Sequence, residues 1–108
     1  MKRAGIGDLD RRLVLEAPRD VPDDIGGVVR AWEFVDVVWA RVYSLSGARR
    51  FEGEREESTT THAITIRWRP DVTGAMRLRY GTRIYAILAA ADGDDRRRTL
   101  NCRCIEIN

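Results

Sequence analysis

No group of residues in this chain has the types and spacing of a known catalytic constellation. His62 is the only histidine, and because an imidazole titrates near neutral pH it is the first candidate for a general base. It alternates with Ile64, Ile66 and Trp68 in the stretch Thr60–Pro70, so it shares one face of an expected strand with apolar residues. A buried structural role is therefore favoured over catalysis, and we expect no catalytic residue and no enzyme activity.

The two cysteines predict no redox or zinc site, and the acidic stretch Asp92–Asp95 predicts no calcium site. Cys102 and Cys104 lie two residues apart, where an extended chain puts their Cα atoms near the upper limit for a disulfide. No further cysteine or histidine partner completes a zinc site, so we expect two buried free thiols, as in a reducing compartment. Asp92–Asp95 begins like a calcium loop, but the twelfth position is Arg103 rather than glutamate, which indicates a turn. No cofactor and no metal are expected.

Length and charge limit the class of protein. The chain has 108 residues, 44% hydrophobic and 33% charged, which predicts one domain over residues 1–108. It has no apolar run of the roughly 18 residues that a membrane span needs, and its charged start has no apolar leader, so we expect a protein inside a cell. The net charge is only +2, although 18 of the 19 basic residues are arginine. That bias reflects either genome base composition or a need for bidentate donors at subunit contacts.

The elements that would position these residues are short strands separated by turns. Before the strand in Thr60–Pro70, the apolar alternation predicts a strand ending at Pro18, a loop over residues 19–27, and two strands over Val28–Trp32 and Val37–Ser44 with an irregular stretch between them. After it, the pattern predicts a hairpin in which Ile84, Ala86 and Leu88 follow the turn Gly81-Thr82. A last strand is predicted over Arg97–Ile107. Six or seven strands at this spacing indicate an all-β barrel or sandwich.

Two stretches are candidates for contact with other chains. The strand over Val37–Ser44 is apolar on both faces, as expected of a central strand in a closed sheet or of one whose outer face meets a neighbour. Its outer face would carry the candidate subunit-interface residues Val37, Trp39, Arg41 and Tyr43. The segment Ser46–Ser58 is a weak helix or an extended loop, because Gly53 interrupts its charged pattern. Its charges lack an evident partner within one copy: Arg49, Arg50, Glu52, Glu54, Arg55, Glu56 and Glu57.

Single-stranded nucleic-acid binding is the alternative function. Small β-barrels bind single strands through faces that mix aromatic and arginine side chains. Along each expected strand these types are segregated here, since Arg67 and Arg69 alternate with Trp68, and Arg77 and Arg79 alternate with Tyr80. With a low net charge as well, a stand-alone barrel that binds nucleic acid is the less favoured interpretation.

Almost the whole chain resembles the tailed-bacteriophage head–tail joining proteins, a family also found in gene transfer agents. The resemblance rests on the order and spacing of six fragments: residues 8–13 (DLDRRL), 24–27 (DIGG) before Trp32, 38–47 (VWARVYSLSG), 61–67 (THAITIR), 81–87 (GTRIYAI) after Met76, and 98–102 (RTLNC). It implies a small six- to seven-stranded β-barrel with a long internal loop.

The resemblance also implies a function and partners. Copies of the chain would form a ring, hexameric or dodecameric, below the portal-bound adaptor protein in the neck of a virion or virus-like particle assembled in the bacterial cytoplasm. The ring would close the DNA-filled head, contact the packaged DNA without sequence specificity, and dock a tail terminator or tail tube protein. In such a ring the segment 46–58 would line the lumen or contact the adjacent subunit.

Overall fold

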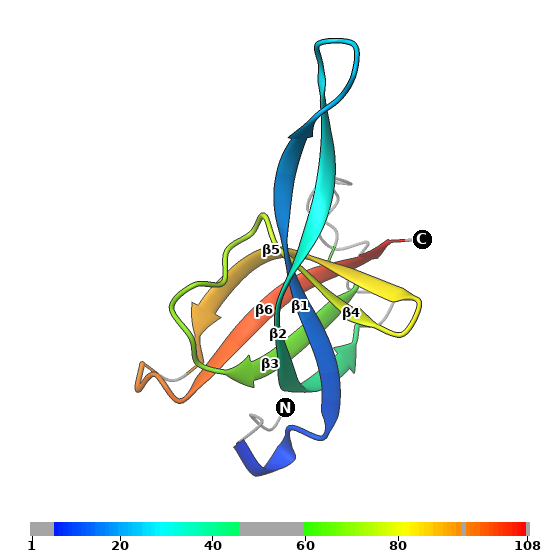
Figure 1. The fold of residues 1–108 in the computed structure, drawn as a ribbon. Helices are drawn as coiled ribbons and strands as arrows, with labels where there is room; N and C mark the ends of the chain where they lie inside the picture. The colour runs from blue at the N-terminus through cyan, green and yellow to red at the C-terminus, as the bar shows by residue number, and fades with distance from the viewer. Residues whose placement is uncertain (1–5, 46–59, 94, 108) are drawn as a thin grey trace.

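The computed structural model describes residues 6–45, 60–93 and 95–107. A short 3-10 turn, η1 (Ile6–Asp8), is followed by six strands: β1 (Arg11–Pro22), β2 (Val28–Ser44), β3 (His62–Arg67), β4 (Arg77–Tyr80), β5 (Arg83–Asp92) and β6 (Thr99–Ile107). All neighbouring strands are antiparallel and close into a barrel in the order β1-β2-β3-β6-β5-β4 (Figure 1). The expected all-β barrel is confirmed.

The barrel interior is filled by the side chains that the alternation predicted for β3 and β6. Ile64 pairs with Cys102 and Ile66 with Leu100, and paired residues share a face of the sheet. The core is completed from the other strands by Leu13, Leu15, Val38, Ala40, Met76, Leu78, Tyr85, Ile87 and Cys104. Trp68, expected on the buried face, follows the end of β3 and is only partly buried against this core.

The β4–β5 hairpin has the expected two-residue turn, and the buried face of β5 carries Tyr85 and Ile87. Gly81 adopts a φ of 63°, and the turn aligns Leu78 with Tyr85. Since Leu78 points inward, Tyr85 and then Ile87 point inward too, and both are buried. Ile84 and Ala86, which the sequence places on the returning strand as found, alternate with these core residues, and Leu88 lies at a bulge.

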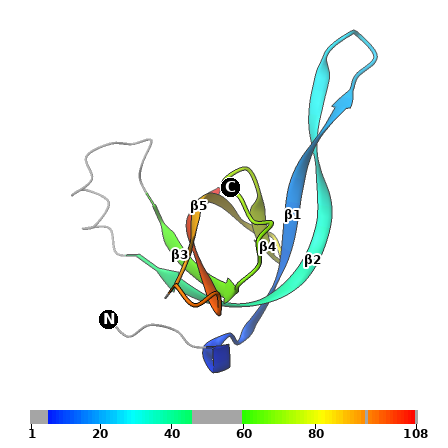
Figure 2. The ribbon, with the colours of Figure 1, turned by 90° about the vertical axis from the view of Figure 1, so that its left-hand side faces the viewer.

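Strands β1 and β2 continue beyond the barrel as a two-stranded hairpin, which we call the arm and define as residues 17–33 (Figures 1 and 2). The predicted strand end at Pro18 and the loop over 19–27 were therefore wrong, although the chain does reverse in this region. Each arm strand has a free edge, where a proline need not donate a ladder hydrogen bond. The reversal itself spans residues 23–27, where the Asp23 carboxylate accepts hydrogen bonds from the backbone N–H groups of Ile25 and Gly27.

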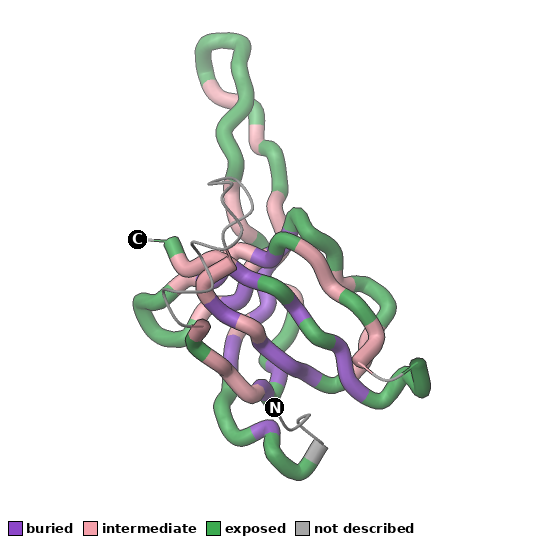
Figure 3. The backbone as a smooth tube through the Cα atoms, turned by 180° about the vertical axis from the view of Figure 1, so that it is seen from behind, coloured by how far each residue is buried: buried purple, intermediate pink, exposed green. Residues whose placement is uncertain are grey.

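The irregular stretch expected before Val37 is a bulge within one continuous strand. Leu15 pairs with Asp36 and the next residue, Glu16, pairs with Phe34, so Val35 is the extra residue in β2. The two strands predicted here are thus a single strand, β2. Bulges bend and twist a strand, and this one lies where β2 passes from the barrel into the arm. Figure 3 shows the buried residues in the barrel and mostly exposed residues along the arm.

Candidate subunit interface

The four residues predicted as an interface strand lie together on the outer face of β2. Trp39 is 52% exposed and Val37 is also exposed. Arg41 and Tyr43 are half-buried, and the Arg41 guanidinium lies 5.3 Å from the Tyr43 ring centroid. The sequence therefore placed these side chains correctly on the outside. Whether they contact another copy stays a prediction.

The arm carries exposed apolar side chains, of which Ile25 was predicted in a loop and Val28 and Val29 in a strand. Ile25 at the turn is 89% exposed and Val28 is 67% exposed, Val29 is also exposed, and so is Phe34 just beyond the arm. A two-stranded hairpin has no second layer to cover its apolar residues, and clustered apolar exposure marks contact surfaces. The sequence signal for this exposed apolar surface was the pair Val28-Val29, which follows an acidic turn.

The arm is anchored to the barrel by a largely buried ion-pair cluster. Glu16 accepts hydrogen bonds from Arg77 Nε at 2.7 Å and from Arg79 Nε at 3.1 Å, across the β1–β4 seam that closes the barrel. The Arg77 guanidinium also lies 4.1 Å from the ring centroid of Trp32 in the arm. Burial by itself would raise the pKa of Glu16, but the two arginine hydrogen bonds outweigh it and lower the pKa. The cluster thus couples the base of the arm to the barrel wall.

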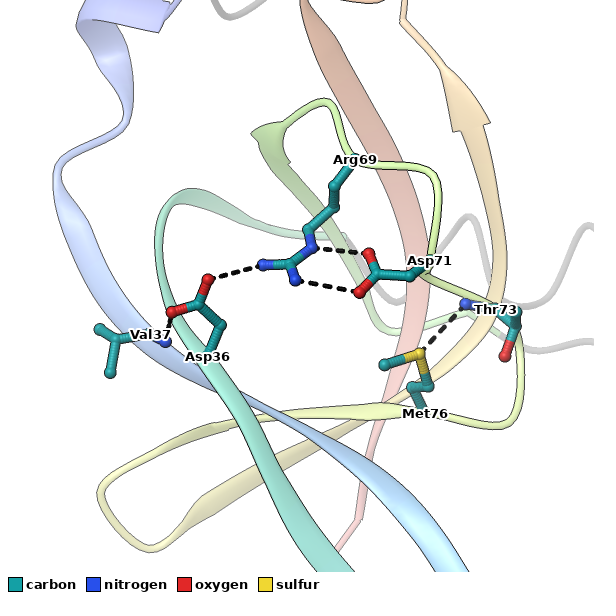
Figure 4. Close-up of polar contacts among 6 residues, drawn as sticks. All are labelled: Asp36, Val37, Arg69, Asp71, Thr73 and Met76. Carbon is teal, nitrogen blue, oxygen red and sulfur yellow. Dashed lines mark hydrogen bonds and ion pairs between the residues drawn. The ribbon is translucent and has the colours of Figure 1, made fainter.

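A second ion-pair cluster fixes the β3–β4 connection beside the bulge. Arg69 makes two hydrogen bonds to the carboxylate of Asp71, from Nε at 2.7 Å and from Nη2 at 3.0 Å, and one from Nη1 to Asp36 at 3.0 Å (Figure 4). The hydrogen bonds from Arg69 to Asp71 lower the pKa of the Asp71 carboxyl. Bidentate arginine–carboxylate pairs restrict geometry more than single contacts do, so the bulged part of β2 is held against this connection.

Aromatic and arginine side chains are not segregated on the barrel surface, contrary to the expectation from single strands. Pairing across strands puts the Arg12 guanidinium 5.9 Å from the Trp39 ring centroid, and the β5–β6 turn puts that of Arg97 5.3 Å from Trp68. The expectation failed because it left out contacts between strands and overlooked Arg41 and Tyr43, which share the outer face of β2. Such pairs are stabilised by cation–π attraction.

His62 has the surroundings of a structural residue. It is buried, its ring packs edge-on against Tyr85 with centroids 4.9 Å apart, and Nδ1 lies 2.9 Å from the Thr61 hydroxyl. Burial lowers the pKa of His62, partly offset by Glu106, whose carboxylate lies 3.9 Å from Nε2. The ring is therefore neutral at pH 7.

The cysteines are free and buried, as expected. Burial raises the pKa of Cys102 to about 12 and that of Cys104 as well, so both thiols are protonated and poor nucleophiles. Among the described residues no group of histidine, cysteine and carboxylate side chains could hold a metal ion. In the same part of the chain no helix has the length and apolar character to cross a membrane. The charged segment predicted to line a lumen, Arg49–Glu57, lies outside the described residues.

The fold and this surface define a small closed β-barrel with a projecting, partly apolar arm. A family model for phage head completion proteins matches residues 5–107. The chain therefore belongs to the phage head completion protein family, which confirms the resemblance read from the sequence. Membership in this structural family supports a non-enzymatic role.

Two solved structures are similar over nearly the whole chain. One is a chain in the virion of a native gene transfer agent particle, 33% identical, with a TM-score of 0.68, covering 92% of this chain and 96% of that one. The other is the solution structure of a protein from Shigella flexneri 2a, 25% identical, with a TM-score of 0.69, covering 94% of this chain and 96% of that one. No curated protein matches the chain.

Proposed function

We propose that this protein is a head-closure, or stopper, component of a phage or gene transfer agent particle. Several copies form a ring below the portal and its adaptor, retain the packaged DNA and dock the tail. The observation that carries the proposal is the family match over residues 5–107, together with the 33% identity to a chain from a gene transfer agent virion. Both cover almost the entire chain, so the proposal concerns the whole protein rather than a shared motif.

The barrel surface is suited to ring formation. A ring of copies needs apolar surface that remains exposed in the single chain, and Val37 and Trp39 on β2 supply it beside the exposed residues of the arm. The partners in this proposal are further copies of the chain, the adaptor above, a tail terminator or tail tube protein below, and the DNA in the channel. The location is the particle neck, after assembly in the bacterial cytoplasm.

Deletion of the gene from the strain that produces the particles tests this role. We expect heads that fill with DNA but carry no tails and lose their DNA, scored by electron microscopy and by nuclease protection of the packaged DNA. A plasmid copy should restore tailed particles, and the His62→Gln variant should restore them as well, because His62 has only structural contacts. Normal tailed, DNA-retaining particles from the deletion strain would refute the proposal.

The charged segment is proposed to close the channel. Its arginines and glutamates can pair with those of adjacent copies when several segments converge on the ring axis. Replacing Arg49–Glu57 with a Gly/Ser linker of equal length should leave the barrel folded and give heads that leak DNA or fail to take tails. Stable tailed particles from this variant would show that the charged segment does not close the channel and that the barrel acts only as a spacer.

Single-stranded nucleic-acid binding remains the second candidate because arginine guanidinium groups lie beside Trp39 and Trp68. This function predicts a monomer whose affinity for single strands falls steeply with salt. A titration of labelled oligonucleotide at two salt concentrations, run beside light scattering of the same sample, distinguishes a binding monomer from a ring.

A further inference from the structure

The arm is long enough to reach across much of a neighbouring barrel. Its strands extend five residues from position 18 to position 22 before the turn, or about 16 Å at roughly 3.3 Å per residue. The described chain measures 51 × 32 × 26 Å, with the arm along its length (Figure 1). An arm of this length spans about half of a barrel placed beside it.

The arm is acidic as well as apolar. Residues 17–33 carry four carboxylates and two arginines. Arg30 lies 3.7 Å from Asp20, whereas Asp24 and Glu33 form no ion pair within the part of the chain that the structure describes. A partner surface should therefore offer guanidinium or ammonium groups beside modest apolar area.

The outer wall formed by β3, β6 and β5 has that character. Register places Ala63, Arg103 and Ala89 side by side across the three strands, and Thr65, Asn101 and Ala91 in the next row. Arg103 is exposed, and so is Arg67 farther along β3. Over residues 6–45, 60–93 and 95–107 neither arginine forms an ion pair. The short neighbours of Arg103 let another backbone approach its guanidinium.

We propose that the arm of one copy lies on the β3–β6–β5 wall of the next copy. A ring of more than two copies needs two different, complementary surfaces on different sides of each subunit. In the barrel order, β1 and β2 lie directly opposite β6 and β5, so the arm and this wall are on opposite sides. The inference rests on the proposed function, because it assumes that copies assemble in a ring, and it specifies which surfaces meet.

This arrangement continues the surface already described on β2. Val37 and Trp39 lie on the outer face of the same strand that forms one side of the arm. A neighbour that receives the arm would also come against this part of β2. The exposed apolar residues of the arm and the outer face of β2 would then be covered by one contact.

Charge reversal on each surface tests the pairing. The arm variant Asp24→Arg/Glu33→Arg and the wall variant Arg67→Glu/Arg103→Glu should each raise the concentration needed for ring formation by roughly tenfold or more, because like charges would meet. The chain with all four changes should assemble within about threefold of the unaltered protein. Ring formation is followed by analytical ultracentrifugation, with circular dichroism as the check on folding. Arg96→Glu, on the β5–β6 turn outside both surfaces, is the matched control and should assemble normally.

Cross-linking keeps the test decisive if a charge variant fails to fold. A chain with Glu33→Cys and Arg103→Cys, treated with a short bis-maleimide, should give a ladder of covalent oligomers up to the ring size. The native cysteines are buried and should contribute no ladder in the unaltered chain.

Each contrary result has a distinct meaning. Three results would overturn the inference and leave the proposed ring intact. The first is ring formation by both charge variants as good as that of the unaltered chain. The others are a failure of the chain with all four changes to recover assembly, and the absence of a cross-linked ladder from intact rings. Loss of tail or head attachment with unchanged ring formation would also overturn it and assign the arm to another neck protein. No ring from the unaltered chain, in solution or in particles, would overturn the proposed function and the inference with it.

Discussion

The same two strands have opposite environments in the two halves of their length. In the barrel half, Leu13 and Leu15 of β1 and Ala40 of β2 are completely buried. In the arm half, beyond the seam with β4, no described residue is buried. The backbone pairing is continuous across both halves apart from one bulge. Strand pairing alone therefore does not define where the folded core ends.

The difference shows where the stability of this protein resides and where the candidate contact surface lies. Apolar side chains removed from water contribute about 25 cal/mol per Å², and in this chain they lie in the barrel. The arm contributes little to that burial, yet it retains Val28, Val29 and Ile25 on its surface. A segment that adds little to the stability of the single chain and still presents apolar residues is suited to contact with another protein.

The largest effect in this comparison is expected from a truncation inside the barrel. Ile64→Ala removes a side chain with no exposed area and should lower the free energy of unfolding by about 2–5 kcal/mol, because it loses apolar burial and leaves a cavity. Denaturant unfolding followed by tryptophan fluorescence gives the value. Leu88→Ala, on the outward bulge of β5, is the control and should cost less than about 1 kcal/mol. Equal losses for the two variants would contradict the assigned core.

The seam between the two halves should show the next largest effect. Glu16→Gln removes a charge that hydrogen-bonds to Arg77 and Arg79, and we expect a loss of about 2–3 kcal/mol at pH 7. Asp20→Asn breaks the exposed pair with Arg30 in the arm and should cost under about 1 kcal/mol. Thermal unfolding of both variants under one buffer condition measures the contrast.

The Glu16 effect should also depend on pH. Because the folded state lowers the pKa of Glu16 below 4.5, its contribution is present above that pH and is lost as the pH falls through the lowered folded value. The stability difference between the unaltered chain and Glu16→Gln should therefore shrink in acid. A stability difference that is constant from pH 7 to pH 3 would argue against an ionised Glu16 carboxylate at the β1–β4 seam.

A smaller effect with a different pH window is expected at His62. Burial holds the pKa of His62 below its ordinary value of 6.5 in the folded state, so its neutral form stabilises the fold above that pH and protonation destabilises it as the pH falls through the folded value. His62→Gln should lower stability by about 1–2 kcal/mol at pH 8, since a buried ring contact and hydrogen bond are altered, and should flatten the decline just below pH 6.5. An identical pH profile for both proteins would show that His62 does not titrate differently on folding.

The sequence predicted the barrel half better than the arm, and the reason is physical. Period-two alternation of apolar and polar residues exists only where one face of a strand is buried and the other is wet, as in β3. The arm has no buried face, so it produces no alternation, and Pro18 resembled a strand end. The missed inward position of Tyr85 was recoverable, because the two-residue turn at Gly81-Thr82 fixes its pairing with Leu78.

The position of the candidate interface residues was predictable in part. Val37 and Trp39 share a face of their strand with Arg41, which favoured that face as the outer one, as found. The Arg12–Trp39 pair and the Glu16 cluster could not be read from the sequence, because they join strands whose pairing partners were unknown. Features that depend on which strands are neighbours require the closed order of the barrel.

The smallest effect on the single chain should come from the arm itself, and it sharpens the comparison most. Val29→Ser replaces an exposed apolar residue of the arm, so the melting temperature of dilute single chains should change by an amount equivalent to less than about 0.5 kcal/mol. If the arm is covered in a ring, the same substitution should lower the melting temperature of assembled rings, because binding stabilises the folded state by mass action. The unaltered chain and the variant are each melted at two concentrations, one below and one above the concentration at which rings form. A loss of stability in the dilute sample would mean that the arm belongs to the fold of the single chain, and an unchanged melting temperature in rings would mean that Val29 is not at the contact.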